Sequence, residues 1–330
     1  MRNLWAGLVL ALSFGPALAE SAGEGQAVRE LAPGVHLIPG SFMPDRGPDG
    51  NTVVFDAPEG LIVVDTGRHV WHSDKILAFA SAQKRPIRVI VNTHWHLDHS
   101  SGNGRLKQVF PAARIYTTNA VDRVLAPGGF LARELALEKT FANDPTLSAT
   151  EREEIAIFVK TMEQQDMLRP DVAIATSGAM SLAGRAFDVR VTDKAVTDAD
   201  VWLLDAESGT AVVGDLVTLP APFFETACPR KWVAALDEVW ATPFKIAIPG
   251  HGEPMRREAF NTYRAAFGAF VDCVLHSAKA PQACAAAWAT GVDGLLGGKD
   301  DQRKRAIAMS EYYVKMLRKD GGKSKDCLAE

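Results

Sequence analysis

Three histidines and an aspartate stand within six positions of this chain, at His94, His96, Asp98 and His99. Neutral imidazole and carboxylate groups are ligands that zinc commonly binds in proteins. Histidine is rare here, with 8 in 330 residues, so chance is a poor explanation for such a cluster. The apolar residues 87–91 just before it indicate a buried strand, which places the four side chains in the turn at the strand's carboxyl end.

The pattern His-x-His-x-Asp-His resembles the zinc loop of the metallo-β-lactamase superfamily. Three more segments resemble motifs of that family and follow in its order, namely Asp65-Thr66-Gly67, Gly214-Asp215-Leu216 and Pro249-Gly250-His251-Gly252. The resemblance covers roughly residues 31–255. It implies an α/β fold, the αββα sandwich of the metallo-β-lactamase type, with metals at one edge between the two sheets.

The resemblance also implies a ligand set for two metal ions: His94, His96, Asp98, His99, Asp215 and His251. In this set Asp98, His99 and His251 complete one site, and the carboxylate of Asp215 bridges to the other. Asp98 and Asp215 would act in catalysis by orienting the nucleophile. Asp65 would hold the zinc loop through hydrogen bonds to the ligands.

One position departs from the family pattern. Family members usually carry a histidine in a Gly-His-Thr-like segment between the two halves, and Val196 occupies that position here. Valine cannot bind a metal, so the site of His94, His96 and Asp215 is one ligand short. Three protein ligands and a water are common at catalytic zinc ions. The sequence is therefore compatible with one or two bound Zn²⁺ ions, and also with iron or manganese.

Four other side chains are candidates to replace the missing ligand: His69, His72, Asp198 and Asp200. The two histidines follow the Asp65 turn, and the two aspartates stand close to Val196. We expect instead that the histidines cap or solvate the helix that follows them. We expect the aspartates to be solvent-exposed turn residues.

The first nineteen residues predict a secretory signal peptide. Arg2 gives a positive start, residues 4–12 an apolar stretch, and Ala17-Leu18-Ala19 a small-residue cleavage site. Cleavage near Ala19 predicts a periplasmic or secreted protein. No later stretch is long and apolar enough to cross a membrane.

Four cysteines in an exported chain are compatible with two disulfides. We favour Cys273 with Cys284, a short link between two helices of the C-terminal region. Cys228 with Cys327 would then tie the tail to the loop that follows Asp215. A free thiol at Cys228, near the metal, is the alternative.

Hydropathy patterning predicts strands that alternate with helices, as in an α/β protein. The predicted strands are 52–55, 61–65, 114–117, 186–191, 201–204, 211–213 and 245–248, and the predicted helices include 73–81, 232–240, 255–276 and 306–317. We divide the mature chain into a metallo-β-lactamase-like domain at 20–255, with a helical insertion at about 131–168, and a helical C-terminal extension at 256–330. The stripe of apolar residues in 255–276 fits core packing.

The chemistry implied by this site is hydrolysis. Zinc lowers the pKa of a bound water and polarises a carbonyl group, so an ester, lactone, thioester or amide is the expected substrate. The loop after Asp215 offers four candidate substrate-binding residues: Phe223, Phe224, Arg230 and Lys231. The formal net charge of −4 argues against a nucleic-acid partner; we expect a small-molecule substrate and leave the oligomeric state open.

A narrower resemblance lies in Thr226-Ala227-Cys228-Pro229, which is similar to a loop of exported zinc metallo-hydrolases named for quinoprotein-linked systems. It implies no substrate and points away from an antibiotic-resistance β-lactamase. Two alternatives to a hydrolase stay open. One is a non-catalytic metal- or ligand-binding relative of the same fold, because of Val196, and the other is an iron-dependent redox member.

Overall fold

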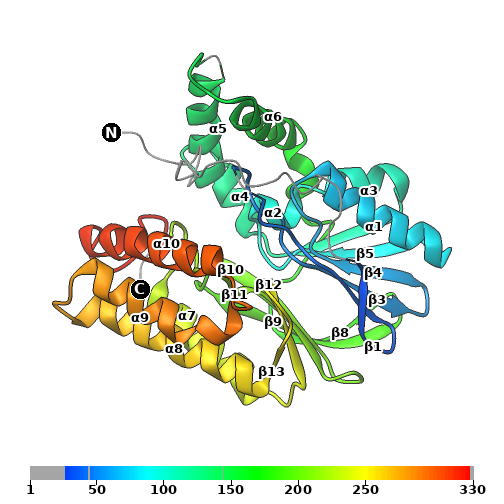
Figure 1. Cartoon of the computed structure of the whole chain (residues 1–330). Coiled ribbons are helices and arrows are strands. Elements are labelled where there is room, and N and C mark those ends of the chain that lie inside the picture. Colours follow the sequence, from blue (N-terminus) through cyan, green and yellow to red (C-terminus); the bar gives the residue numbers. More distant parts are fainter. Residues whose placement is uncertain (1–26, 44, 143, 328–330) are drawn as a thin grey trace.

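The computed structural model describes residues 27–43, 45–142 and 144–327, and it consists of two β-sheets that pack face to face between outer layers of helices (Figure 1). This is the αββα sandwich that the sequence predicts. The predicted signal peptide lies outside the described residues. None of the described helices is long and apolar enough to span a membrane.

The first sheet has seven strands in chain order. They are β1 (Arg29–Ala32), β2 (Val35–Ile38), β3 (Thr52–Ala57), β4 (Gly60–Val64), β5 (Ile87–Val91), β6 (Arg114–Thr117) and β7 (Val172–Ala173). Strands β1 to β4 are antiparallel, whereas β4, β5, β6 and β7 are parallel. The zinc-loop motif follows β5, so its turn leaves the carboxyl end of a parallel strand.

The second sheet has six strands in the order β13-β12-β11-β10-β9-β8. They are β8 (Gly178–Leu182), β9 (Arg185–Asp193), β10 (Ala199–Asp205), β11 (Thr210–Thr218), β12 (Ile246–His251) and β13 (Met255–Arg256). Strands β11 and β12 are parallel neighbours. Their carboxyl ends therefore lie side by side and carry Asp215 and His251 to the same edge as the zinc loop.

Alternating burial explains why both sheets stack. In β3, Val53 and Phe55 face the second sheet, where they meet residues such as Val189 and Leu203. Val54 points the other way, into a separate cluster beneath the helices. Both faces of the first sheet are therefore covered, which is why its central strands are almost continuously hydrophobic.

Helices cover the outer faces of the two sheets. α1 (Val70–Gln83) and α3 (Asn103–Val109) lie over the first sheet, while α7 (Pro229–Ala241), α8 (Arg257–His276), α9 (Pro281–Gly291) and α10 (Asp300–Lys319) lie over the second (Figure 1). The stripe predicted on 255–276 is buried in this second layer, as Phe260, Tyr263 and Phe267 show. A helical C-terminal region is thus present, as expected.

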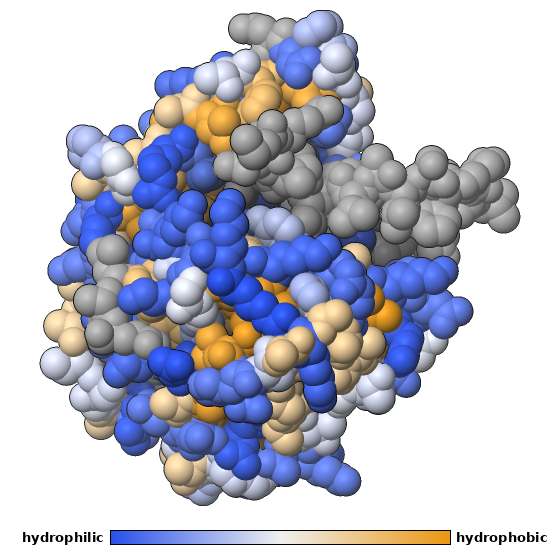
Figure 2. All heavy atoms as spheres, turned by 90° about the vertical axis from the view of Figure 1, so that its left-hand side faces the viewer, coloured by the Kyte–Doolittle hydropathy of each residue, from blue (hydrophilic) through white to orange (hydrophobic). Residues whose placement is uncertain are grey.

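The predicted helical insertion contains α5 (Phe130–Phe141) and α6 (Ala149–Glu163), preceded by α2 (Leu97–Ser100) and α4 (Ala120–Leu125) and followed by the short 3₁₀ turn η1 (Gln165–Leu168). A capping box starts α6, because the Ser148 side chain accepts from the backbone N–H of Glu151 and the Glu151 side chain accepts from the backbone N–H of Ser148. In Figure 2, hydrophobic residues gather near the top of a mainly polar face, where this insertion lies.

Both predicted disulfides are confirmed. Cys273 and Cys284 join α8 to α9 with a Cα–Cα distance of 5.8 Å. Cys228 and Cys327 have a Cα–Cα distance of 5.2 Å, so the alternative of a free thiol at Cys228 is wrong. Two disulfides fit a protein of an oxidising compartment.

Candidate metal centre

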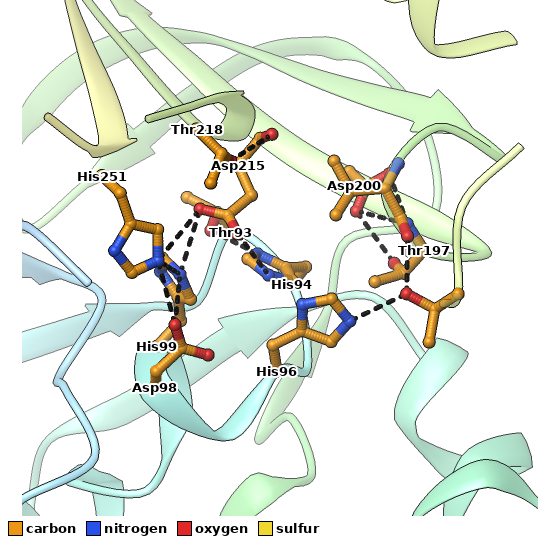
Figure 3. A network of polar contacts seen from close by, with 12 residues as sticks. Thr93, His94, His96, Asp98, His99, Thr197, Asp200, Asp215, Thr218 and His251 are labelled. Atoms are coloured by element: carbon orange, nitrogen blue, oxygen red, sulfur yellow. Dashed lines mark hydrogen bonds and ion pairs between the residues drawn. The ribbon is translucent and has the colours of Figure 1, made fainter. Parts of the chain in front are cut away.

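The zinc loop and the ends of β11 and β12 bring all six predicted ligands together between the two sheets (Figure 3). They form two groups, each of which could hold a metal ion. One consists of His94, His96 and Asp215, and the other of Asp98, His99 and His251; in each, the potential ligand atoms lie within 4.8 Å of one another. The six side chains therefore form one buried polar centre.

Asp215 connects the two groups through its two carboxylate oxygens. Its Oδ2 lies 3.8 Å from Nε2 of His94. Its Oδ1 lies 3.2 Å from Nε2 of His99 and 3.5 Å from Nε2 of His251. A Cβ on Gly250 would stand only 1.9 Å from that Oδ1, so the glycine of the Pro-Gly-His-Gly motif leaves the room that the carboxylate occupies.

Asp65 holds the zinc loop in place by three hydrogen bonds. It accepts from the backbone N–H of Thr93 at 2.8 Å, from the Thr93 hydroxyl at 2.8 Å and from Nδ1 of His99 at 2.9 Å. Asp65 itself has a φ of 61°, a conformation that a non-glycine residue adopts at some cost. The contacts to ligands and loop are the geometry expected for the supporting role predicted for Asp65.

Hydrogen-bond direction fixes which nitrogen of His94 faces the centre. The Thr93 hydroxyl gives its hydrogen to Asp65, so it accepts from Nδ1 of His94, 2.9 Å away. This leaves Nε2 of His94 unprotonated, buried and without a hydrogen-bond partner in the described part of the chain. Burial, with His99 and His96 close by, lowers the pKa of His94 well below its usual value. A buried lone pair of this kind is what a metal ion would satisfy.

The opposite electrostatic situation exists at His99. Burial disfavours its charged form, but the carboxylates of Asp215, Asp98 and Asp65 outweigh burial and raise the pKa of His99 well above its usual value. The Nε2 atoms of His99 and His251 are 3.2 Å apart, and Oδ2 of Asp98 lies 2.9 Å from Nε2 of His251. Nitrogen and carboxylate ligands converge here on one point, a donor set that suits zinc.

The expectations for the residues around Val196 need correction. Asp200 is not a solvent-exposed turn residue but is buried, and burial raises its pKa to about 7. It accepts from the backbone N–H groups of Val196 and Thr197 and from the Thr197 hydroxyl. Asp198 is largely shielded too and pairs with Arg123. Both carboxylates are therefore engaged with the chain, and neither belongs to the ligand groups.

His69 and His72 are also buried rather than solvated. His69 stands at the start of α1, where its Nδ1 lies 3.0 Å from Asp49 and its Nε2 lies 3.1 Å from Glu154 of the insertion. The Nε2 of His72 lies 2.8 Å from the Thr52 hydroxyl. Neither histidine supplies the missing ligand. Asp49, His69 and Glu154 form a buried ion-pair cluster. The sequence gives no signal for it, because its three members come from distant segments.

A loop that we call the flap, residues 41–50, covers one side of the centre with its described residues Phe42 and Gly50. The backbone N–H of Gly50 donates to the carbonyl of Asp98 at 2.9 Å, and a Cβ on Gly50 would stand 2.4 Å from the His99 ring. The ring of Phe42 lies 5.5 Å from that of His251. Asn51, for which the sequence gives no signal, donates to the carbonyls of Pro249 and Gly252 and so fixes the His251 turn.

The four predicted substrate-binding residues have different positions. Phe223 packs edge-on against His96, with ring centroids 5.2 Å apart. Phe224 is fully buried among Trp232 and other aromatic residues of the C-terminal core, so it presents no surface to a substrate. Arg230 and Lys231 are exposed on the first turn of α7, and their role stays a prediction.

A pocket of about 370 Å³ is lined by Trp95 and Thr226, both of which contact His96. Six of its lining residues come from the zinc loop, the loop before α7, α4, the insertion and the C-terminal tail: Trp95, Thr226, Arg123, Arg133, Lys325 and Asp326. The tail is held there by the Cys228–Cys327 disulfide and by Arg133, whose guanidinium binds both carboxylate oxygens of Asp326 at 2.8 and 3.0 Å.

Comparison with known proteins now identifies the class to which this fold and site belong. The sequence profile of the Metallo-beta-lactamase superfamily matches residues 45–251. The match covers more than half of the chain and includes all six candidate ligands. The protein is therefore a member of the metallo-beta-lactamase superfamily.

Individual relatives are more distant. A linear primary-alkylsulfatase of Pseudomonas sp. (strain ATCC 19151) is 28% identical over 219 residues, which are 61% of this chain and 41% of that protein. The chain thus matches less than half the length of this relative. A metallo-beta-lactamase family protein of Thermus thermophilus superposes with a TM-score of 0.59 at 18% identity, covering 88% of this chain and 95% of that one.

A metallo-beta-lactamase from Pontibacter korlensis superposes with a TM-score of 0.52 at 17% identity, over 73% of this chain and 98% of that one. At such identities these structures establish the shared fold and no shared substrate. The family membership makes a hydrolase the coarse expectation for this chain.

Proposed function

We propose that the protein is an exported, zinc-dependent hydrolase that cleaves an ester, lactone, thioester or amide bond. The observation that carries the proposal is the position of Asp215, which directs one carboxylate oxygen toward each of two ligand groups. A purely structural zinc site would normally be closed by cysteine and histidine ligands. Here all four cysteines are in disulfides.

The fit of the residues to a metal is good on both sides. His94 offers a buried lone pair, and Asp98, His99 and His251 converge within hydrogen-bonding distance. We assign the tighter site to Asp98, His99 and His251 with Asp215, and the weaker site to His94 and His96 with Asp215. When bound, the metal would supply an acidified water and a polarising charge for the substrate oxygen.

The chain's own residues would handle orientation and proton transfer. Asp98 directs Oδ2 toward His251, and its side chain is 16% exposed, against 4% for Asp215. The other oxygen of Asp98, Oδ1, is therefore the carboxylate atom of the centre that we assign to accept a proton and release it to solvent. Asp215, more deeply buried, would orient the nucleophile.

We assign the pocket beside His96 to the part of the substrate that does not react. Trp95 and Phe130 give it apolar walls, while Arg123 and Arg133 already face carboxylates of the chain. Lys325, exposed at the rim, would add a positive charge. Phe223 continues the apolar wall toward His96. These features favour a substrate with an apolar part and a negatively charged group.

A sulfate ester is the second candidate substrate. The observation that favours it is the similarity to a linear primary-alkylsulfatase. That relative is more than twice as long as the matched segment, and an alkyl sulfate does combine an apolar chain with a negative charge. The two candidates differ in the bond that is cleaved and can be compared directly on the same protein.

The decisive experiment combines metal analysis with turnover. Protein purified from the periplasm without added zinc is analysed for metal, then assayed with 4-nitrophenyl acetate, a lactone, a thioester, a β-lactam and sodium dodecyl sulfate. Turnover that disappears on chelation and returns with Zn²⁺ supports the proposal. Bound metal without any turnover would favour the non-catalytic alternative, and bound iron with redox activity would favour the redox alternative. In the metal analysis and the turnover assays, a Val196→Leu variant serves as the control, because leucine, like valine, has a side chain that cannot bind metal.

A further inference from the structure

A chain of two hydrogen bonds links His96 to the backbone of Val196, the residue that stands where the family has a histidine. Nε2 of His96 lies 2.9 Å from the Thr226 hydroxyl, and that hydroxyl donates to the Val196 carbonyl at 2.9 Å. All three residues are buried. In Figure 3 the other nitrogen of His96 faces His94, on the side of the metal centre.

The direction of these bonds follows from counting hydrogens. A carbonyl can only accept, so the single hydrogen of the Thr226 hydroxyl is used on Val196. The hydroxyl oxygen must then accept from His96, which therefore carries its proton on Nε2. Nδ1 is left unprotonated, and this is the atom that faces the centre.

We propose that Thr226 is a positioning residue that fixes the tautomer and ring orientation of His96, so that its Nδ1 can bind a metal. The inference rests on the proposed function, since it concerns the weaker of the two sites. A hydrogen bond from the second nitrogen of a histidine ligand orients the ring and raises its basicity. Val196 thus keeps a part in the site through its backbone, although its side chain cannot bind the metal.

The acceptor at the end of this chain is itself held firmly. Asp200 accepts from the N–H groups of Val196 and Thr197, and the N–H of Cys228 donates to the carbonyl of Ala195 at 2.9 Å. Cys228 is in turn bound to Cys327. The loop that carries the Val196 carbonyl and the loop that carries Thr226 are therefore joined by a second, backbone hydrogen bond beside the first.

The test is a titration of metal-free protein with Co²⁺, followed by its visible absorption, on three variants. Thr226→Val keeps the shape and removes the hydroxyl, whereas Thr226→Ser keeps the hydroxyl and removes the methyl group. A His96→Ala variant shows which binding step belongs to the weaker site. We expect Thr226→Val to weaken that step by about 10- to 100-fold, with the other step unchanged and Thr226→Ser close to the wild type.

Several results would overturn the inference. One is equal Co²⁺ affinity of Thr226→Val and wild type at both steps, and another is an equal loss in Thr226→Ser, which would indicate packing rather than the hydroxyl. Should Thr226→Val fail to fold, Thr226→Ala against Thr226→Ser gives the same comparison. If the wild-type protein binds only one Co²⁺ ion, this inference is overturned and a single-metal hydrolase remains. If the wild-type protein binds no Co²⁺, the proposed function is overturned as well.

Discussion

The two sides of the metal centre are supported in different ways. On the side of Asp98, His99 and His251, the ligands are held by Asp65, by the Asn51 contacts and by the backbone of the 41–50 flap. On the side of His94 and His96, two threonine hydroxyls, Thr93 and Thr226, do this work. One side has a full ligand set with a carboxylate, Asp65, in direct contact with a ligand, and the other has a reduced set whose direct contacts are neutral hydroxyls.

This difference shows that the absence of one ligand need not disrupt the arrangement of the residues around the site. The segment with Val196 still carries a buried carboxylate, Asp200, that fixes its backbone, and the Val196 carbonyl still takes part in the network. Preorganised ligands bind a metal with little reordering, so the orientation of the remaining side chains matters as much as their number.

Replacing the residue shared by the two sides should have the largest effect. We expect Asp215→Asn to lower kcat/KM by about 1,000-fold, equivalent to about 4 kcal/mol, because one of the two oxygens becomes an amide NH2 group and the negative charge shared by both ligand groups is lost. Elemental analysis should show that less metal is retained. An Asp215→Asn protein with full metal content and wild-type turnover would mean that the carboxylate does not join the two sites.

The flap over the complete side offers a test with a defined pH dependence. Burial disfavours charge on His69, but hydrogen bonds to Asp49 and Glu154 outweigh it and raise the pKa of His69. The ion pair therefore stabilises the fold fully below about pH 6.5, the usual value, and this contribution is lost as the pH rises through the folded pKa.

We expect His69→Gln to lower the free energy of unfolding of metal-free protein by about 3 kcal/mol at pH 6, and by less at pH 9. Urea denaturation at the two pH values measures this. His276→Gln is the control, since His276 pairs with Asp272 at the surface and should change stability by about 0.5 kcal/mol or less. The same loss at both pH values would contradict a charged His69.

Asp65 reaches both sides, because it binds His99 directly and His94 through Thr93. We expect Asp65→Asn to weaken Zn²⁺ binding by about 10- to 100-fold, measured by competition with a coloured chelator. Asp56→Asn, a substitution in a partly exposed carboxylate, is the control and should leave affinity unchanged. Equal affinity for both variants would remove Asp65 from the support of the centre.

The smallest effect is expected at the residue that departs from the family pattern. Val196→Ala should leave Zn²⁺ affinity within about twofold, because only the backbone of Val196 takes part in the network. It should cost about 2 kcal/mol or less of stability, from the lost packing. Loss of zinc affinity by more than tenfold would show that the valine side chain shapes the site.

That the six candidate ligands come together could be predicted from the sequence, because each of them follows a strand or lies near the end of one. His94 and His99 lie just beyond β5, Asp215 lies in β11 and His251 ends β12, and parallel strands deliver such residues to one edge of a sheet. Local motifs thus carry information about the global position of the side chains. The family resemblance implies the sandwich, and the helical spacing of the apolar residues predicts the buried stripe of α8.

Other features depend on contacts that no local pattern contains. The partners of His69 are 20 residues upstream and 85 residues downstream. Phe223 and Phe224 are adjacent, yet one packs on His96 and the other lies in the core. An irregular loop has no periodicity to separate the two, and burial of Asp200 likewise depends on the backbone groups that it caps.

The disulfide between Cys228 and Cys327 also sets an order of events during biosynthesis. Its cysteines are 99 residues apart, so the bond cannot close until nearly all of the described chain has been translated. The loop with Thr226 and the wall of the pocket near Lys325 therefore gain their covalent support after both sheets are available to fold. All six candidate ligands lie at or before His251, so they can come together before this bond fixes the pocket wall near Lys325.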